Sequence, residues 1–132
     1  MRKCIGLVLL VFLVACGGSA SFQKYSASDV TKQLQAQGLA ISDIKPDQRD
    51  PNSQAPNVAV EDMNFTIASI TPKGGHVLIF KEQKDLDAMK AWYARFPDLA
   101  PYVYTNGNAM LQLNSGLPKL EADKFKAALE TV

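Results

Sequence analysis

The sequence predicts an α+β fold, a two-layer sandwich in which antiparallel β-hairpins pack on about three helices. Two observations predict it. Short runs with two-residue alternation come in pairs, and each pair is joined by a turn signal. Other segments repeat apolar residues at spacings of three and four, which is typical of helices with one buried face. The expected order is helix, strand, long loop, two strands, helix, two strands, helix. The outer face of such a sheet is expected to lie in water, where a partner could bind.

The first helix is expected over about residues 27–37. Ser26 and Asp29 have the spacing of a capping box, with Asp in place of the usual Glu. Gly38 supplies a C-terminal stop signal. Residues 39–44 follow as a short strand with imperfect alternation.

Residues 45–58 contain three prolines and several Asp, Asn and Gln residues. This composition opposes both a helix and a central strand. A loop of fourteen residues without periodicity is long for a compact domain, so it is either functional or a loose connection. We favour the loose connection.

The first hairpin is expected from residues 63–70 and 76–80. Phe65 and Ile67 alternate with polar or small residues in the first strand. The second strand is a continuous apolar run, which is typical of a central strand. Residues 71–75 contain Pro and paired Gly, which suit a chain reversal.

The second helix is expected over about residues 85–95, where apolar residues form one stripe and Pro97 ends it. Asn106-Gly107 is a strong two-residue hairpin signal and joins strands 102–105 and 108–113. The third helix is expected over about residues 120–131, with Pro118 near its start and an apolar stripe facing the sheet (Ala122, Phe125, Ala128, Leu129, Val132).

The N-terminus has the composition of a secretory signal. Arg2 and Lys3 precede an apolar run at residues 5–14, which is too short for a stable membrane span of roughly 20 apolar residues. Small and polar residues follow the run, so no second half extends it.

Leu13-Val14-Ala15-Cys16 resembles the lipobox of bacterial lipoproteins. The resemblance implies cleavage between Ala15 and Cys16 and a covalent lipid on the Cys16 sulfur, which would be the only cofactor-like group. Two or more acyl chains give a stable membrane anchor. The alternative is an ordinary signal peptide cut near Ala15 or Ala20, with Cys16 incidental. The predicted organisation is a signal peptide at 1–15, a lipidated cysteine and flexible tether at 16–25, and one α+β domain at 26–132. Phe22 and Tyr25 could instead dock on the domain and shorten the tether.

The resemblance also implies a location in the cell envelope, facing the extracytoplasmic space. Gly17 follows the cysteine, in place of the Asp that resembles an inner-membrane retention signal in enteric-type bacteria. In a cell with two membranes this favours the outer membrane. In a cell with one membrane the protein would face outward from the plasma membrane.

The predicted mature chain shortens from 132 to 117 residues, which fits a single domain. Cys4 leaves with the signal peptide, so no pair of cysteines remains for a disulfide. Basic residues fall from 14 to 12 against 13 acidic ones, a formal net charge of −1. This balance does not suggest nucleic acid as a partner. Nothing in the sequence indicates an oligomeric state.

No catalytic constellation stands out. His76 is the only histidine, and we interpret it as a solvated strand residue. A zinc site needs three or four N or S ligands, and the predicted mature chain has neither a second His nor a free Cys for one. The acidic pair Glu61-Asp62 borders a strand, and Asp85 with Asp87 complements the positive end of a helix. Gly74-Gly75 lacks the strand and helix context of a phosphate loop. We therefore expect neither an enzyme nor a metal site.

Four aromatic residues form the predicted binding surface: Trp92, Tyr93, Tyr102 and Tyr104. Trp and Tyr are favoured at binding sites because they bring large contact area at low entropic cost. The alternative, which we favour, is that they form a seam between the second helix and the second hairpin.

Residues 80–129 also resemble, in their general pattern, small bacterial lipoproteins of about this length. The matching features are structural: the acid-rich start of the second helix, Tyr102-Val103-Tyr104, Asn106-Gly107-Asn108 and Leu117-Pro118. This resemblance implies no activity. We expect a membrane-anchored module that binds a protein or envelope partner without catalysis. The alternatives are a small-ligand receptor and, less favoured, an enzyme with an unrecognised site.

Overall fold

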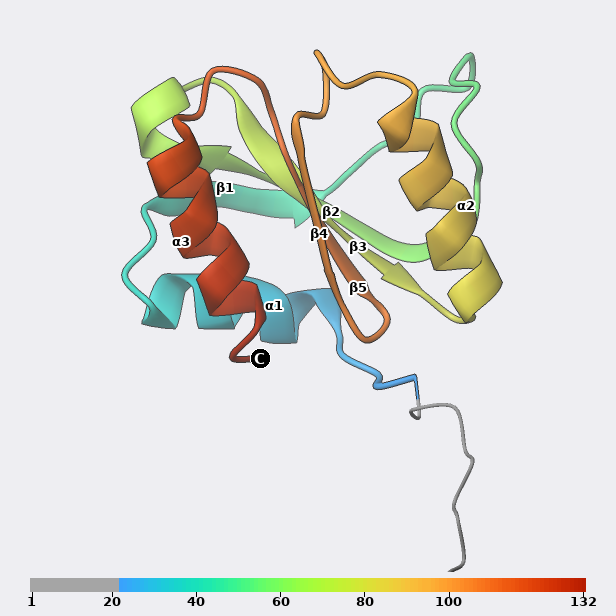
Figure 1. Ribbon diagram of the computed structural model, residues 1–132, viewed down its shortest axis with the longest axis horizontal. Coiled ribbons are helices and arrows are strands. Elements are labelled where there is room, and N and C mark those ends of the chain that lie inside the picture. Colours follow the sequence, from blue (N-terminus) through green and yellow to red (C-terminus); the bar gives the residue numbers. More distant parts are fainter. Residues whose placement is uncertain (1–21) are drawn as a thin grey trace, which may run out of the picture.

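The computed structural model describes residues 22–132. One antiparallel sheet of five strands in the order β1-β2-β3-β5-β4 packs with three α-helices (Figure 1). The strands are β1 (Ile41–Pro46), β2 (Ala59–Ile67), β3 (Gly74–Phe80), β4 (Tyr102–Asn106) and β5 (Ala109–Leu113). The α-helices are α1 (Ala27–Ala36), α2 (Gln83–Ala94) and α3 (Lys119–Leu129), and a short 3-10 turn, η1, spans Ala68–Ile70. The predicted α+β class, with antiparallel hairpins on about three helices, is confirmed.

Strand β2 differs most from its predicted bounds. It begins at Ala59, four residues before the predicted start, and pairs with β3 from Ala59 opposite Phe80. Its first half was missed because Val60 and Glu61 are exposed and Glu61 and Asp62 place a carboxylate on each face, so its apolar alternation is weak. It ends at Ile67 because η1 turns the chain before Ile70.

The main core lies between one face of the sheet and the helices α1 and α3. Ala109, Leu111 and Leu113 of β5 all point into it and are fully buried, as their alternation predicts. Phe65 of β2 stacks on Phe125 of α3, with ring centroids 6.4 Å apart. The predicted capping box at the start of α1 is present.

Helix α2 packs on the opposite face of the sheet, apart from α1 and α3 (Figure 1). A second cluster joins Leu86 and Met89 of α2 to side chains from β3 and β5 (Leu78, Phe80, Met110). The expectation that the outer face lies in water is therefore wrong where α2 covers it. The physical reason is the continuous apolar run of β3, which supplies buried side chains to both faces.

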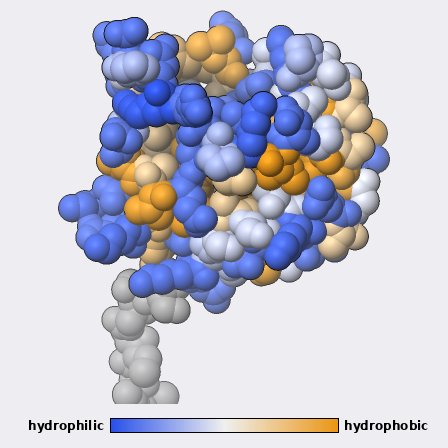
Figure 2. Space-filling model, turned by 180° about the vertical axis from the view of Figure 1, so that it is seen from behind, coloured by the Kyte–Doolittle hydropathy of each residue, from blue (hydrophilic) through white to orange (hydrophobic). Residues whose placement is uncertain are grey.

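The part of this face beyond α2 is polar. Seen from the side opposite to Figure 1, the surface is largely hydrophilic, with small apolar areas between polar ones (Figure 2). A row of paired residues, Asn64, His76 and Gln112, crosses β2, β3 and β5 here. The α2 face is thus divided into an apolar half under the helix and a polar half beside it.

The chain from Phe22 to Tyr25 lies against the β4–β5 turn. The Asn108 side chain accepts a hydrogen bond from the Tyr25 backbone N–H and donates one to the Tyr25 carbonyl. The Asn108 backbone N–H donates to the Gln23 carbonyl oxygen at 2.8 Å. Gly107 has φ +53°, and an added Cβ would meet the Tyr25 ring at 3.0 Å. Phe22 also packs against the second cluster, so residues 22–25 of the predicted tether dock on the domain, as the alternative states.

Candidate functional site

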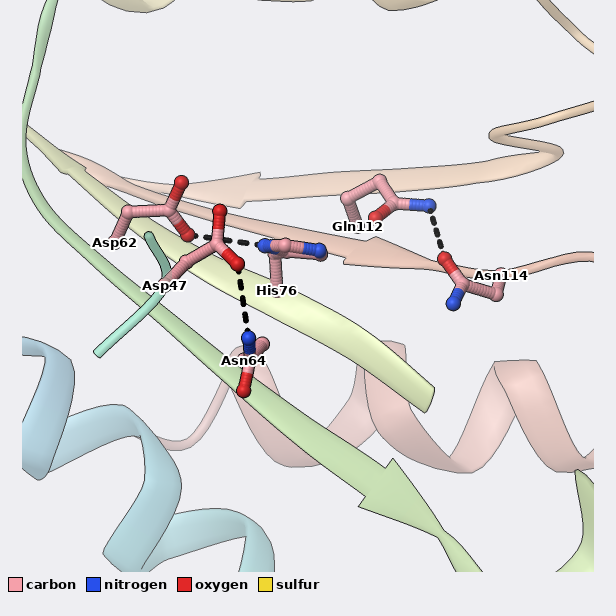
Figure 3. Close-up of polar contacts among 6 residues, drawn as sticks. All are labelled: Asp47, Asp62, Asn64, His76, Gln112 and Asn114. Carbon is pink, nitrogen blue, oxygen red and sulfur yellow. Dashed lines mark hydrogen bonds and ion pairs between the residues drawn. The ribbon is translucent and has the colours of Figure 1, made fainter. Parts of the chain in front are cut away.

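Two carboxylates and an imidazole gather on the polar half of the α2 face (Figure 3). Asp62 lies on β2 and His76 on β3, and the register of the pair brings them to the same face of the sheet. Asp47 follows β1 directly, and its backbone N–H donates to the Asp62 carbonyl at 2.9 Å. All three residues are partly buried.

Hydrogen bonds orient the three side chains. His76 Nδ1 lies 3.0 Å from Asp62 Oδ1, and Nδ1 is the donor because an ionised carboxylate only accepts. The Asn64 amide donates to Asp47 Oδ1 at 2.8 Å. On the other side of the imidazole, the buried Gln112 amide donates to Asn114 Oδ1 at 3.2 Å (Figure 3).

Of the hollows beside this polar row, two are also lined by helix α2. The larger, of about 530 Å³, lies between the loop after β1 and helix α2, and Asp47, Asp62 and His76 line it. The smaller, of about 380 Å³, is lined mainly by Trp92, Phe96, Leu99 and Ala100 and by the amides of Gln112 and Asn114. His76 and Tyr93 line both hollows. We call the two together the sheet-face groove.

The loop after β1, at residues 47–58, is a wall of this groove. Lys45 and Pro46, which were predicted to lie in the loop, belong to β1 and pair with β2. Asp47, Asp50 and Pro56 line the larger hollow. The Arg49 guanidinium donates hydrogen bonds to the carbonyl oxygens of Ser53 and Ala55 and closes the loop on itself.

Two side chains that line the groove, His76 and Tyr93, have raised pKa values. Burial lowers the pKa of His76, but the hydrogen bond to Asp62 and the charges of Asp62 and Asp47 outweigh it, so this pKa lies above its usual value. Burial, with a smaller contribution from the same two carboxylates, raises the pKa of Tyr93 to about 12. The Tyr93 phenol therefore stays neutral to a higher pH than an ordinary tyrosine does.

The raised pKa of His76 predicts a pH-dependent contribution to stability. The folded protein holds the His76 proton more tightly than the unfolded chain, so the pair with Asp62 stabilises fully below the unfolded pKa of about 6.5. The contribution disappears as pH rises through the folded pKa. Asp62→Asn should therefore lower the urea midpoint more at about pH 6 than at about pH 8.5. Because the chain has one histidine, its NMR titration in metal-free buffer reads this pKa directly. A pKa at or below about 6.5 contradicts the prediction.

The structure separates the four aromatic residues of the predicted binding surface. Trp92 and Tyr93 lie on α2 and line the groove. Tyr102 and Tyr104 pack against the main core on the other face, where the Tyr102 hydroxyl donates to the Leu117 carbonyl at 3.0 Å. The prediction that these four residues form one surface is therefore wrong, because the sheet lies between the two pairs.

Trp92 is held in place by its neighbours on the helix end. Its ring lies 4.8 Å from the Phe96 ring, and the Arg95 guanidinium sits 5.5 Å from its centroid. The ring therefore forms a fixed apolar wall at one end of the groove.

The sequence did not predict the cluster of Asp47, Asp62 and His76 at the acidic end of the groove. The signal available was the first hairpin: its register places Asn64 opposite His76 and brings Asp62 to the same face. Asp47 had no signal, because nothing in an aperiodic loop indicates which strand it lies against.

Ala15 and Cys16, the predicted cleavage and lipidation residues, lie outside the described residues. Within residues 22–132, no helix combines the length and the apolar character that a membrane crossing requires.

Comparison with protein-family models, with curated proteins and with solved structures finds no match to this chain.

Proposed function

We propose that the protein is a lipid-anchored lipoprotein of the cell envelope whose domain binds a partner, without catalysis, in the sheet-face groove. One observation carries the binding site: two hollows on one face of the sheet share His76 and Tyr93 and are lined by chemically different groups. The anchor remains the inference from Cys16 and the residues before it.

The groove favours a ligand with two unlike parts. Its acidic end holds Asp47 and Asp62, which accept hydrogen bonds or attract positive charge. Its other end presents Trp92 and Phe96, which suit an apolar group. A basic or hydrogen-bond-donating group beside an apolar one, as on a peptide of an envelope partner, matches both ends.

A small-ligand receptor is the second candidate, and the size of the hollows favours it. Volumes of about 530 Å³ and 380 Å³ lie within the range of small-molecule pockets. A peptide segment and a small amphipathic molecule would use the same residues.

Binding is favoured over catalysis by the surroundings of His76. An Asp–His pair serves nucleophilic catalysis when the free imidazole nitrogen activates a nucleophile. Among the described residues, the His76 ring hydrogen-bonds to Asp62, and no Ser, Thr or Cys hydrogen-bonds it. The pair is therefore better suited to holding a ligand.

Replacing Trp92 by Ala should weaken partner capture about tenfold or more, since a buried aromatic anchor contributes about 2 kcal/mol. Tyr104→Ala is the matched control, because Tyr104 lies on the opposite face. The measurement is capture of chemically crosslinked partners from native membranes by the full-length protein, with thermal unfolding as a check on folding.

His76→Gln is a second groove variant that removes little packing, so it separates binding from stability. Equal capture by Trp92→Ala, His76→Gln and the unchanged protein would show that the groove is not the binding site. Loss of capture in Tyr104→Ala alone would show that the binding site lies on the other face of the sheet.

Cys16→Ser should release the protein from membranes into the soluble exported fraction, because the sulfur that carries the lipid is absent. Membrane fractionation followed by immunoblotting measures this. Cys4→Ser is the control, since Cys4 lies in the segment that cleavage removes. If the Cys16→Ser protein stays with the membrane, the proposed anchor is wrong.

A further inference from the structure

We propose that Asp47, Asp62 and His76 form a binding site for a divalent transition-metal ion, with Zn²⁺ the best match to the donor set. The proposal does not depend on the lipid anchor. With the ion bound, the acidic end of the groove would present the metal, in place of free carboxylates, to the groove's ligand. The proposal also revises the sequence expectation of no metal site, which counted only His and Cys as ligands.

The geometry of the three side chains fits an ion between them. One ligand atom from each residue can be chosen so that all three lie within 4.8 Å of one another. Donor atoms around a tetrahedral zinc ion, with bonds of about 2.0–2.2 Å, lie roughly 3.5 Å apart. Nδ1 of His76 and Oδ1 of Asp62 are already 3.0 Å apart. The carboxylate of Asp47 supplies the third donor within the same 4.8 Å.

The local charge favours a cation. Two carboxylates face one half-buried space, and in the described part of the chain neither forms a salt bridge with a Lys or Arg. The group in contact with Asp62 is the Nδ1–H of His76, which carries positive charge only when the imidazole is protonated. When the ion binds, this proton leaves to solvent and the Nδ1 lone pair takes its place on the metal.

The supports behind the ligands are also present. The Asn64 amide holds Asp47 Oδ1 and leaves Oδ2 free, and the backbone N–H of Asp47 ties the loop to β2. Partners of this kind fix the direction of ligating side chains in metal sites. Asp62 and His76 stand on paired strands, which fixes their separation.

The donor set selects among ions. One imidazole and two carboxylates suit Zn²⁺ and its first-row neighbours, whereas Mg²⁺ and Ca²⁺ prefer six or more oxygen ligands. Three protein ligands leave a fourth position for water or for a ligand atom in the hollow of about 530 Å³.

The test is calorimetric titration of Zn²⁺ into the full chain in detergent, with Cys4→Ser and Cys16→Ser so that no thiol competes. We expect one ion per chain and a shift of the His76 imidazole NMR signals, which no other histidine can produce. His76→Ala should abolish the site, and Asn64→Ala should weaken it about tenfold, as loss of a supporting hydrogen bond does.

Asp50→Asn is the matched control, because Asp50 lines the same hollow but lies outside the ligand set. If His76→Ala does not fold, Asp47→Asn tests the same site from the loop with an isosteric side chain. The proposal is overturned by no saturable binding of Zn²⁺, by binding that survives both His76→Ala and Asp47→Asn, or by equal binding of Mg²⁺ without any change in the imidazole signals.

Discussion

Replacing Phe125 by Ala is expected to lower the free energy of unfolding by about 3–5 kcal/mol. The Phe125 ring is 1 % exposed and stacks on Phe65, so truncation leaves a cavity between α3 and the sheet. Loss of this magnitude is a large fraction of the stability of a small domain. Urea unfolding of the full chain, followed by far-UV circular dichroism, measures it.

Leu120→Ala is the control for Phe125→Ala. Leu120 lies on the same helix but is 75 % exposed, so its removal should change stability by no more than about 0.5 kcal/mol. Equal losses from the two variants would mean that α3 does not pack on the sheet as described.

Replacing Gly74 by Ala is expected to cost about 3 kcal/mol or more, at the upper end of the range for overpacking. An added Cβ would overlap the Phe65 carbonyl group on the neighbouring strand, and a backbone group cannot rotate away as a side chain can. The pairing of β2 with β3 must therefore shift. Hydrogen exchange of the β2 and β3 amides, with the urea midpoint, measures the loss.

Gly38→Ala separates this clash from the general cost of losing a glycine. Gly38 has φ +80° but open space around it, so Ala there should cost only about 1 kcal/mol, the strain of the left-handed conformation. If Gly74→Ala is as mild as Gly38→Ala, the register of the first hairpin is wrong.

Local signals were sufficient for most of the fold. Asn106-Gly107 predicted the second hairpin one residue early, since Asn106 belongs to β4 and the turn is Gly107-Asn108. The first hairpin was predicted with its turn displaced: the chain reverses over residues 68–73, and Gly74 and Gly75, assigned to the turn, are the first residues of β3. The side of the sheet on which α2 packs could not be predicted. The β3 run Val77–Phe80 is apolar on both faces, and only the complete sheet shows which face α1 and α3 leave free.

The sequence could predict two of the three residues in the acidic cluster. Asp62 and His76 follow from the hairpin register, since antiparallel pairing fixes which residues share a face. Asp47 does not, because its position depends on how a loop with three prolines folds back on β2. Tyr93 was named from its residue type, and its neighbours in the groove come from four separate parts of the chain.

The contact between the N-terminal residues and the β4–β5 turn determines how the domain would be presented at a bilayer. Gln23 and Tyr25 are hydrogen-bonded to Asn108, so at most seven residue steps, or about 25 Å of fully extended chain, separate Cys16 from the first of these contacts. With a lipid on Cys16, the turn end of the sheet would face the membrane. The domain could rotate about this connection but would stay near the bilayer. A partner would therefore have to bind close to the membrane in which Cys16 is anchored.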